Sequence, residues 1–211
     1  TKSLTSALIG IAIDKGFISS VSDRVIDYLP EYADVITGGR ENITIKNLLT
    51  MSSGIDWNES DHAYGTMEND ATHFTVSEDP VRFFFNKSLI HAPGTYWEYN
   101  GGGTDILGHI IEITSGMTLT DFADNYLFQP LRIYEYDLDR YINNLYSAMG
   151  GLAMRPRDFL KIGNLYLNAG KFNSDEIIDP EWINNSTIPE MNSTWWEGYS
   201  YCYHWWYREF T

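Results

Sequence analysis

Apolar residues recur at helical spacing along most of this chain, and this periodicity limits its possible folds more than any other feature. In the clearest segment, residues 155–168, Pro156 stands at the start and Gly170 follows the end, as is typical of helix termini. The same spacing predicts helices at residues 4–12, 25–29, 44–51, 80–85, 104–114, 118–127 and 180–183. Strand signals are scarce, and the aromatic run 199–207 is the best candidate. The chain is therefore predicted to be mainly α-helical, with long loops at 54–74 and 137–149.

Length and composition indicate one folded unit. The chain has 211 residues, about one large domain, and no linker, repeat or low-complexity tract interrupts it. Its 43% hydrophobic and 15% aromatic content is typical of a protein with a sizeable core. We therefore predict a single domain over residues 1–211.

The charge balance argues against one class of partner. There are 14 basic and 29 acidic residues, which gives a formal net charge of −15, and no basic stripe offsets it. Phosphate backbones repel such a surface, so nucleic-acid binding is not expected. The longest apolar run, Ala7 to Ile13, is far shorter than the roughly 20 residues of a membrane-spanning helix. No transmembrane segment is predicted.

A lysine at the start of the first helix is the first candidate for chemistry. In the pattern S-x-x-K, a serine one turn before a lysine places hydroxyl and amine on one helix face. The lysine can then take the serine proton, and the helix N-terminus favours the developing negative charge. Lys2 fits the lysine of this pattern, and the serine would fall two positions before Thr1. Taken alone, such a lysine is more often a solvated surface residue.

Four collinear segments resemble the penicillin-recognising, class C β-lactamase-related serine hydrolases. TKSLTSALIGIAIDKG resembles the nucleophile helix of that family, and ITIKNLLTMSSGIDW resembles its I-T-I-x-x-L-L-T-H-T-S-G segment. PGTYWEYNGGGTDILGHIIE resembles the segment with the family's Tyr motif, and GGLAMRPRDFLKIGNLYLNAGK resembles its G-G-L-x-x-x-P-x-D helix. The resemblance implies an α+β, β-lactamase/transpeptidase-like fold. In that fold, most of the central antiparallel sheet would come from segments outside this chain.

The resemblance also implies roles for individual residues. Lys2 matches the lysine of S-x-x-K, the general base that activates the serine, and Tyr99 matches the tyrosine of Y-x-N, which shuttles protons to the leaving group. Gly101 stands where the family pattern often has asparagine, and Asn100 is one place early. We take Asn100 and Gly101 as candidate substrate-binding positions. The departure at Gly101 fits an esterase, amidase or peptidase better than a true β-lactamase. The family's last motif, a K-T-G or H-x-G strand, would lie beyond Tyr207.

Other signals favour structural roles. No spacing suits a metal, so none of the five histidines is assigned as a ligand. His204 and Cys202 are expected to be packed among aromatic residues. The hydroxyl of Ser3, a poor substitute nucleophile, is expected to bond locally. The tryptophans at 195, 196, 205 and 206 are expected to form a buried cluster, with a substrate cleft as the alternative.

The function implied is a serine hydrolase that cleaves an ester or amide, such as a D-amino-acid peptide or a β-lactam, through an acyl-serine intermediate. It would need no metal or organic cofactor, and its partner would be a small-molecule ester, amide or peptide. Two alternatives stay open: a non-catalytic binding protein on the same scaffold, and a fragment without activity of its own. A bacterial protein, periplasmic or secreted, is favoured over a cytoplasmic one. The sequence leaves the substrate and the oligomeric state open.

Overall fold

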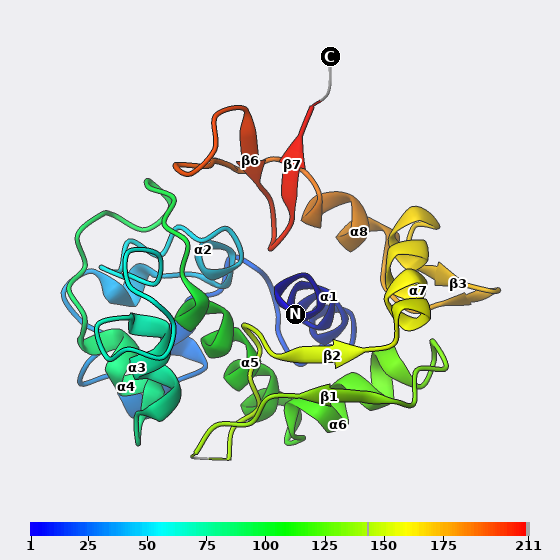
Figure 1. Ribbon diagram of the computed structural model, residues 1–211, viewed down its shortest axis with the longest axis horizontal. Helices are drawn as coiled ribbons and strands as arrows, with labels where there is room; N and C mark the ends of the chain where they lie inside the picture. The colour runs from blue at the N-terminus through cyan, green and yellow to red at the C-terminus, as the bar shows by residue number, and fades with distance from the viewer. Residues whose placement is uncertain (143, 210–211) are drawn as a thin grey trace.

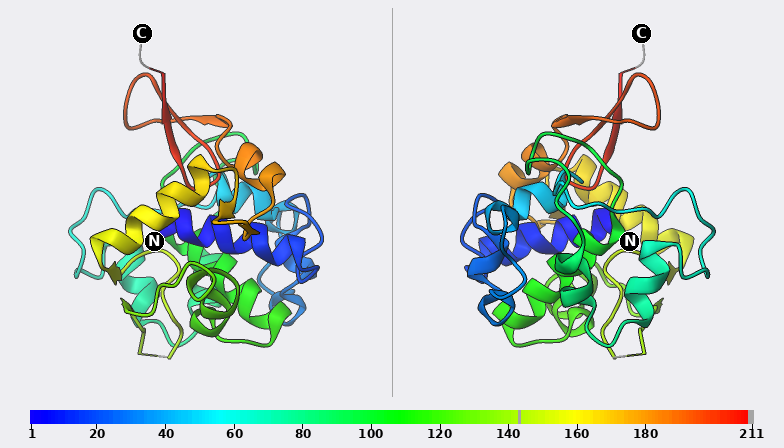
Figure 2. Two further views of the ribbon diagram at one scale, coloured as in Figure 1. Left: turned by 90° about the vertical axis from the view of Figure 1, so that its right-hand side faces the viewer. Right: turned by 90° about the vertical axis from the view of Figure 1, so that its left-hand side faces the viewer.

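One buried helix organises the molecule. The computed structural model describes residues 1–142 and 144–209. Helix α1 (Lys2–Asp14) crosses the middle, and the other elements are arranged around it (Figures 1 and 2). Every residue from Leu4 to Ala12 on α1 is buried. A helix buried on all sides has no need of a polar face, which explains the scarcity of charges in this segment.

The remaining helices are short apart from two. Helix α5 (Gly101–Ser115) packs against α1, and α7 (Pro156–Leu167) lies at the molecule's edge (Figure 1). The other α-helices are α2 (Ile45–Leu49), α3 (Asp70–Val76), α4 (Pro80–Asn86), α6 (Leu119–Ala123) and α8 (Pro180–Ser186). Single turns occupy Val25–Asp27, Pro30–Tyr32 and Arg40–Asn42, and a π-helical stretch, Asp124–Phe128, continues α6.

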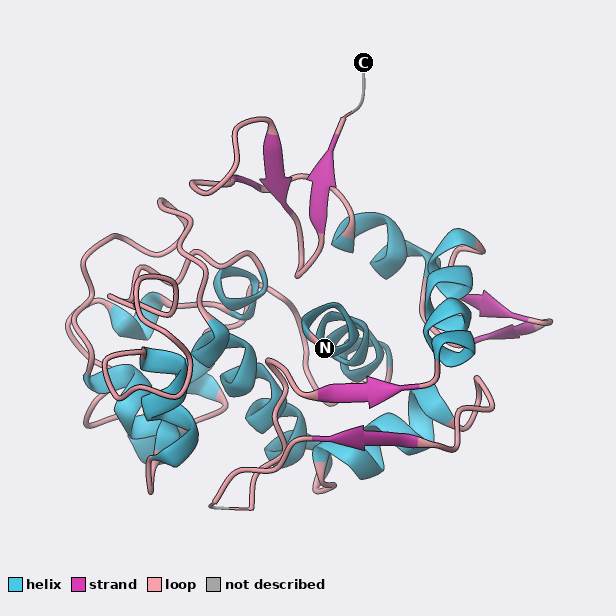
Figure 3. Ribbon diagram, viewed as in Figure 1, coloured by secondary structure: helices cyan, strands magenta, loops and turns pink. Residues whose placement is uncertain are grey.

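Strands play a small part in the described residues (Figure 3). β1 (Tyr136–Leu138) pairs antiparallel with β2 (Leu152–Met154), with Asp137 opposite Ala153. β3 (Lys171–Phe172) and β4 (Asp175–Glu176) form a second pair. The third sheet has the order β5 (Met191–Asn192), β6 (Tyr199–Tyr201) and β7 (Trp206–Arg208). The mainly helical character predicted from the sequence is confirmed.

Side-chain caps fix where many of these helices begin. The first free amides of a helix need acceptors, and polar side chains supply them here. Thr44 and Asn47 form a capping box at α2, and Asp79 precedes Pro80 at the start of α4. Further caps are Asn69 for α3, Asn100 for α5, Thr118 for α6 and Asp179 for α8.

Three predicted segments differ from the structure. The predicted loop 54–74 contains the start of α3, whose sequence DATHFTV has too few apolar residues for a clear helical pattern. The predicted strand 199–207 is a hairpin of β6 and β7, and the chain turns at His204 with φ 60°. Helix α5 also begins three residues before the predicted start at Thr104.

Burial confirms some expectations and corrects others. Cys202 and His204 are buried among aromatic rings as expected, with 1% and 2% of their surface exposed. The tryptophan cluster is more open than predicted, because Trp195 and Trp196 are 37% and 50% exposed. The hydroxyl of Ser3 donates to the carbonyl of His204 rather than to a local group. Within the described residues, no helix combines the length and the apolar character that crossing a membrane requires.

Candidate active site

Lys2 lies in the first turn of α1 and is held from two directions. Its Nζ donates to the carbonyl oxygen of Met149 at 3.0 Å. The same nitrogen lies 4.7 Å from the centre of the Tyr99 ring. A cation at this distance from an aromatic face is attracted by the ring's quadrupole. The structure therefore brings together the two residues assigned to catalysis from the sequence, although 97 positions separate them.

Tyr99 stands at the end of the extended segment that leads into α5. Its ring lies 4.6 Å from the ring of Trp195 and 6.3 Å from that of the buried Trp97. Trp195, from the loop between β5 and β6, therefore packs on one side of Tyr99, and the Lys2 ammonium lies against its face. This packing limits the orientations open to the phenol.

Asn100 and Gly101 form the N-terminus of α5. The Oδ1 of Asn100, a residue only 3% exposed, accepts from the amide of Gly103 at 2.9 Å and so caps the helix. The amide of Gly101 donates to the Oε2 of Glu59 at 2.6 Å. Asn100 and Gly101 thus make these hydrogen bonds to other groups of the protein. Their role in substrate binding stays a prediction.

Asp105, on α5, is hydrogen-bonded to the segment whose Met149 carbonyl accepts from Lys2. Its Oδ1 accepts from the amides of Ala148 and Met149 at 2.7 and 2.8 Å, and its Oδ2 accepts from the Tyr141 hydroxyl at 2.5 Å. Burial raises the pKa of Asp105 to about 7, against the opposing influence of these three donors and of Lys2. Since Met149 holds Lys2 through its carbonyl, Asp105 acts on the position of the lysine through the backbone of 148–149.

Glu59 is a second buried carboxylate near this site, with 3% of its surface exposed. It accepts from the indole of Trp57 at 2.6 Å and from the hydroxyl of Tyr64 at 3.1 Å, in addition to Gly101. Burial and the charge of Glu59 raise the pKa of Tyr64 above its ordinary value. A cavity of about 270 Å³ lies elsewhere, but one of about 240 Å³ adjoins these groups. It is lined by Lys2, Glu59, Tyr64, Thr75, Asp139, Tyr141, Ser147, Met149, Gly150 and Gly151.

Sequence reasoning missed both carboxylates. Asp105 could have been found, because it is a charged residue between Thr104 and Ile106 on a helix whose neighbours are all buried. Glu59 gave no such signal, since it lies in a stretch without periodicity and its contacts to α5 cross 42 positions. His204 faces the same region: burial and then the Lys2 charge lower its pKa well below the ordinary value.

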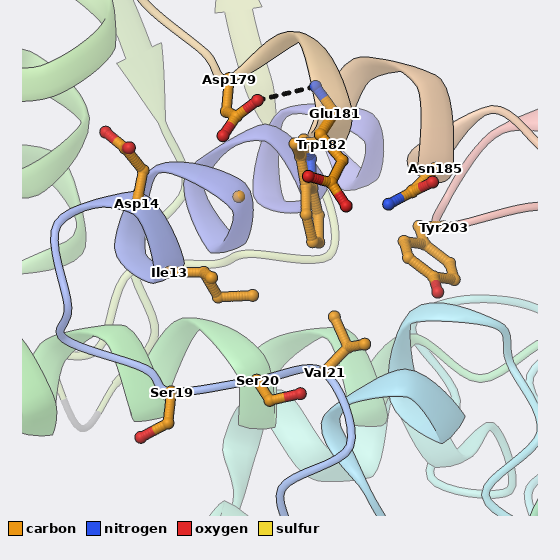
Figure 4. Close-up of a pocket in the computed structure, with 11 residues that line it drawn as sticks. Ile13, Asp14, Ser19, Ser20, Val21, Asp179, Glu181, Trp182, Asn185 and Tyr203 are labelled. Atoms are coloured by element: carbon orange, nitrogen blue, oxygen red, sulfur yellow. Dashed lines mark hydrogen bonds between the residues drawn. The ribbon is translucent and has the colours of Figure 1, made fainter.

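The cavity of about 270 Å³ lies at the opposite end of α1 (Figure 4). Asp14 and Ile13 line it from α1, and Glu181 and Trp182 line it from α8. Trp182 fits against α1 because residue 10 is glycine: a Cβ there would lie 2.4 Å from the indole. Twelve residues of helix separate Lys2 from Asp14, about 18 Å at the usual rise, so this cavity is remote from the candidate site. Within residues 1–142 and 144–209, no cluster of side chains suits a metal ion.

Several known proteins are similar to this chain in sequence or in fold. The 6-aminohexanoate-dimer hydrolase of Paenarthrobacter ureafaciens is 26% identical over 194 residues, which cover 87% of this chain and 48% of the relative. The chain thus spans about half the length of that curated relative. A D-stereospecific amidohydrolase from Streptomyces sp. superimposes with a TM-score of 0.74 at 18% identity, covering 100% of this chain and 69% of the other. A penicillin-binding protein from Bacillus halodurans also gives 0.74 at 18% identity, with 97% and 67% covered.

These similarities support the β-lactamase/transpeptidase-like fold expected from the sequence, in a family whose members are serine hydrolases. The family model described as Beta-lactamase matches residues 1–209. The chain therefore belongs to the β-lactamase family.

Proposed function

We propose that this protein is a serine hydrolase that cleaves a small-molecule ester or amide through an acyl-serine intermediate. The observation that carries the proposal is the approach of the Lys2 ammonium to the Tyr99 ring beside a cavity of about 240 Å³. The nucleophile is a serine two positions before Thr1. That position is one helical turn from Lys2, so the serine hydroxyl and the amine share a face of the helix.

The proposed reaction has two halves. In the first, Lys2, once its ammonium has released a proton to solvent, accepts the serine proton while the serine oxygen forms a bond to the carbonyl carbon of the substrate. The tetrahedral intermediate then collapses, the bond to the leaving alcohol or amine breaks, and Tyr99 delivers a proton to that group, which Lys2 restores. In the second half, a water molecule attacks the acyl-serine by the same proton path and releases the acid.

The helix N-terminus contributes to the proposed reaction. The free amides of the first turn of α1 carry partial positive charge, which stabilises negative charge that develops beside them. Backbone amides, one of them from the serine itself, would hold the oxyanion of the tetrahedral intermediate. The Met149 carbonyl accepts a hydrogen bond from Lys2 and keeps the amine near the ring of Tyr99.

The relatives indicate the substrate class in outline. One is named for a 6-aminohexanoate dimer and another for D-stereospecific amide hydrolysis. These names support amides beside esters as substrates of this protein. The rival proposal is a binding protein without catalysis, and Gly101, which offers no side chain at the third position of Y-x-N, favours it.

Hydrolysis by the full-length protein, followed from the first turnover into the steady state, tests the proposal. We expect hydrolysis of p-nitrophenyl butyrate to begin with a burst of nitrophenolate close to the enzyme present, because nitrophenolate is a good leaving group and the acyl-enzyme should accumulate before water releases it. We expect kcat/KM for nitrocefin to be lower by about tenfold or more, because the asparagine of Y-x-N is absent at Gly101. Turnover of nitrocefin above that of the ester would contradict the substrate assignment. Failure to turn over esters, amides and nitrocefin alike would favour the binding protein.

A further inference from the structure

Glu59 is a buried carboxylate with no basic partner in the part of the chain that the structure describes. Its Oε2 accepts two hydrogen bonds of 2.6 Å, from the Trp57 indole and the Gly101 amide. Its Oε1 accepts one, of 3.1 Å, from the Tyr64 hydroxyl. No lysine or arginine among residues 1–142 and 144–209 forms a salt bridge with it. A carboxylate has about four acceptor sites, so Oε1 has room for another donor.

The place that Glu59 occupies is the one toward which a side chain at position 101 would point. A Cβ added to Gly101 would lie 2.9 Å from Glu59 Oε2 and 2.5 Å from Met149 Sδ. Both distances are too short for a real contact, so the carboxylate and the thioether fill the space that a larger residue needs. The carboxylate of Glu59 can therefore lie in this place because residue 101 has no side chain.

A carboxylate in place of the asparagine amide of Y-x-N changes the hydrogen bonds that the site can offer to a substrate. An asparagine amide presents both a donor and an acceptor, whereas an ionised carboxylate accepts only. Glu59 and Lys2 line the same cavity, and Asp139 lines it as well. The lining residues thus comprise two carboxylates and one ammonium, and that ammonium is already bonded to the carbonyl of Met149.

We propose that Glu59 determines substrate specificity by replacing the amide of the Y-x-N motif with a carboxylate that accepts from an ammonium or N–H group of the substrate. The negative charge of Glu59 also disfavours substrates that carry a carboxylate close to the scissile bond. It repels a second anion there, and the one lysine that lines the cavity is already bonded to the carbonyl of Met149. This inference rests on the proposed hydrolase function and adds to it a substrate class: esters or amides with an amino group in the acyl part.

Glu59→Gln is the matched variant. Glutamine has the same shape, its oxygen can accept from Trp57 and Gly101, and its amide can donate to the Tyr64 oxygen. Asp56→Asn, an exposed carboxylate three positions away, is the control for removing one negative charge. The melting temperature of each full-length variant shows whether its fold is intact.

The first experiment compares three p-nitrophenyl esters with acyl chains of equal length that end in an ammonium, a methyl or a carboxylate group. For wild type and Asp56→Asn we expect kcat/KM for the ammonium ester to exceed that for the neutral ester by about tenfold, and the carboxylate ester to be the poorest. In Glu59→Gln the ammonium-to-neutral and carboxylate-to-neutral ratios of kcat/KM should both move to within about threefold of one, mainly through changes in KM. An unchanged ammonium-to-neutral ratio in folded Glu59→Gln would overturn the inference.

The second experiment needs no turnover and separates the inference from the proposed function. Titration calorimetry with n-butylammonium and with butyrate measures binding to the wild type and to Glu59→Gln. We expect butylammonium to bind the wild type more tightly than butyrate, and this preference to disappear in Glu59→Gln. If no ester is hydrolysed but the preference is found, the inference stands and the hydrolase proposal fails. If the wild type shows no preference for the ammonium ion, Glu59 does not select substrates by charge.

Discussion

Replacing Lys2 by methionine is expected to lower kcat/KM for p-nitrophenyl butyrate by about 10²- to 10⁴-fold in the full-length protein, the usual contribution of a positioned general base. Methionine keeps much of the apolar stem that passes Tyr99 but removes the amine that would accept the serine proton. The hydrogen bond to Met149 O and the contact with the Tyr99 ring would be lost with it. Both kcat and the initial burst should fall.

Lys15→Met is the matched control for Lys2→Met. Lys15 follows the C-terminal end of the same helix, and its side chain is 47% exposed in a pair with Asp14. An exposed pair of this kind contributes about 0–1 kcal/mol, so its removal should leave both rate and stability near wild type. A Lys2→Met protein that is folded and retains more than about a third of the wild-type rate would show that Lys2 is not the base.

Replacing Asp105 by alanine is expected to destabilise the protein by about 3 kcal/mol or more and to lower the rate of hydrolysis as well. The substitution leaves the amides of Ala148 and Met149 and the hydroxyl of Tyr141 without their acceptor, and each unsatisfied buried group costs about 1–3 kcal/mol. Because Met149 also holds Lys2, displacement of this segment moves the base. Chemical denaturation and ester kinetics on the same samples measure the two effects.

Asp105→Asn separates charge from hydrogen bonding. The amide oxygen can still accept from both backbone amides, so the loss of stability should be smaller than with alanine. Burial raises the pKa of Asp105 from its ordinary value of 3.8 to about 7, so the folded state binds the proton more tightly than the unfolded state. The stability linked to this proton is full below about pH 4 and is lost as the pH rises through about 7.

The unfolding free energy of Asp105→Asn should therefore improve relative to wild type as the pH rises from about 4 to 8. Denaturation curves at matched pH values give this difference directly. A difference that is constant with pH, or that moves the opposite way, would show that Asp105 is not preferentially protonated in the folded protein.

The sequence predicted elements best where one physical signal dominated. In α7, a proline at the start, an amphipathic pattern and a following glycine all agree, and the helix Pro156–Leu167 lies within the predicted 155–168. In α5, the three leading glycines disfavour a helix by propensity, so the prediction began at Thr104. The structure begins it at Gly101, because Glu59 and Asn100 accept amides of the first turn. A Cβ at Gly102 would also meet the ring of Trp57 at 2.5 Å.

The sequence predicted those residues of the candidate site that belong to a motif with a recognisable spacing. Lys2 and Tyr99 each stand in a recognisable pattern, and the structure places them in contact. Glu59 and Asp105 act through partners 42 to 44 positions away, which no local pattern encodes. The exposed position of Trp195 beside Tyr99 likewise depends on how the loop between β5 and β6 folds back on the site, and composition alone favoured burial.

The central claim is that a serine one turn before Lys2 forms the acyl-enzyme. The most direct test is to label the full-length protein with a fluorophosphonate, digest it and locate the adduct by peptide mass spectrometry. We expect one modified residue, the serine two positions before Thr1, and loss of labelling when that serine is replaced by alanine. An adduct on another hydroxyl, such as Ser3 or Ser147, or an active protein that takes no label, would contradict the account.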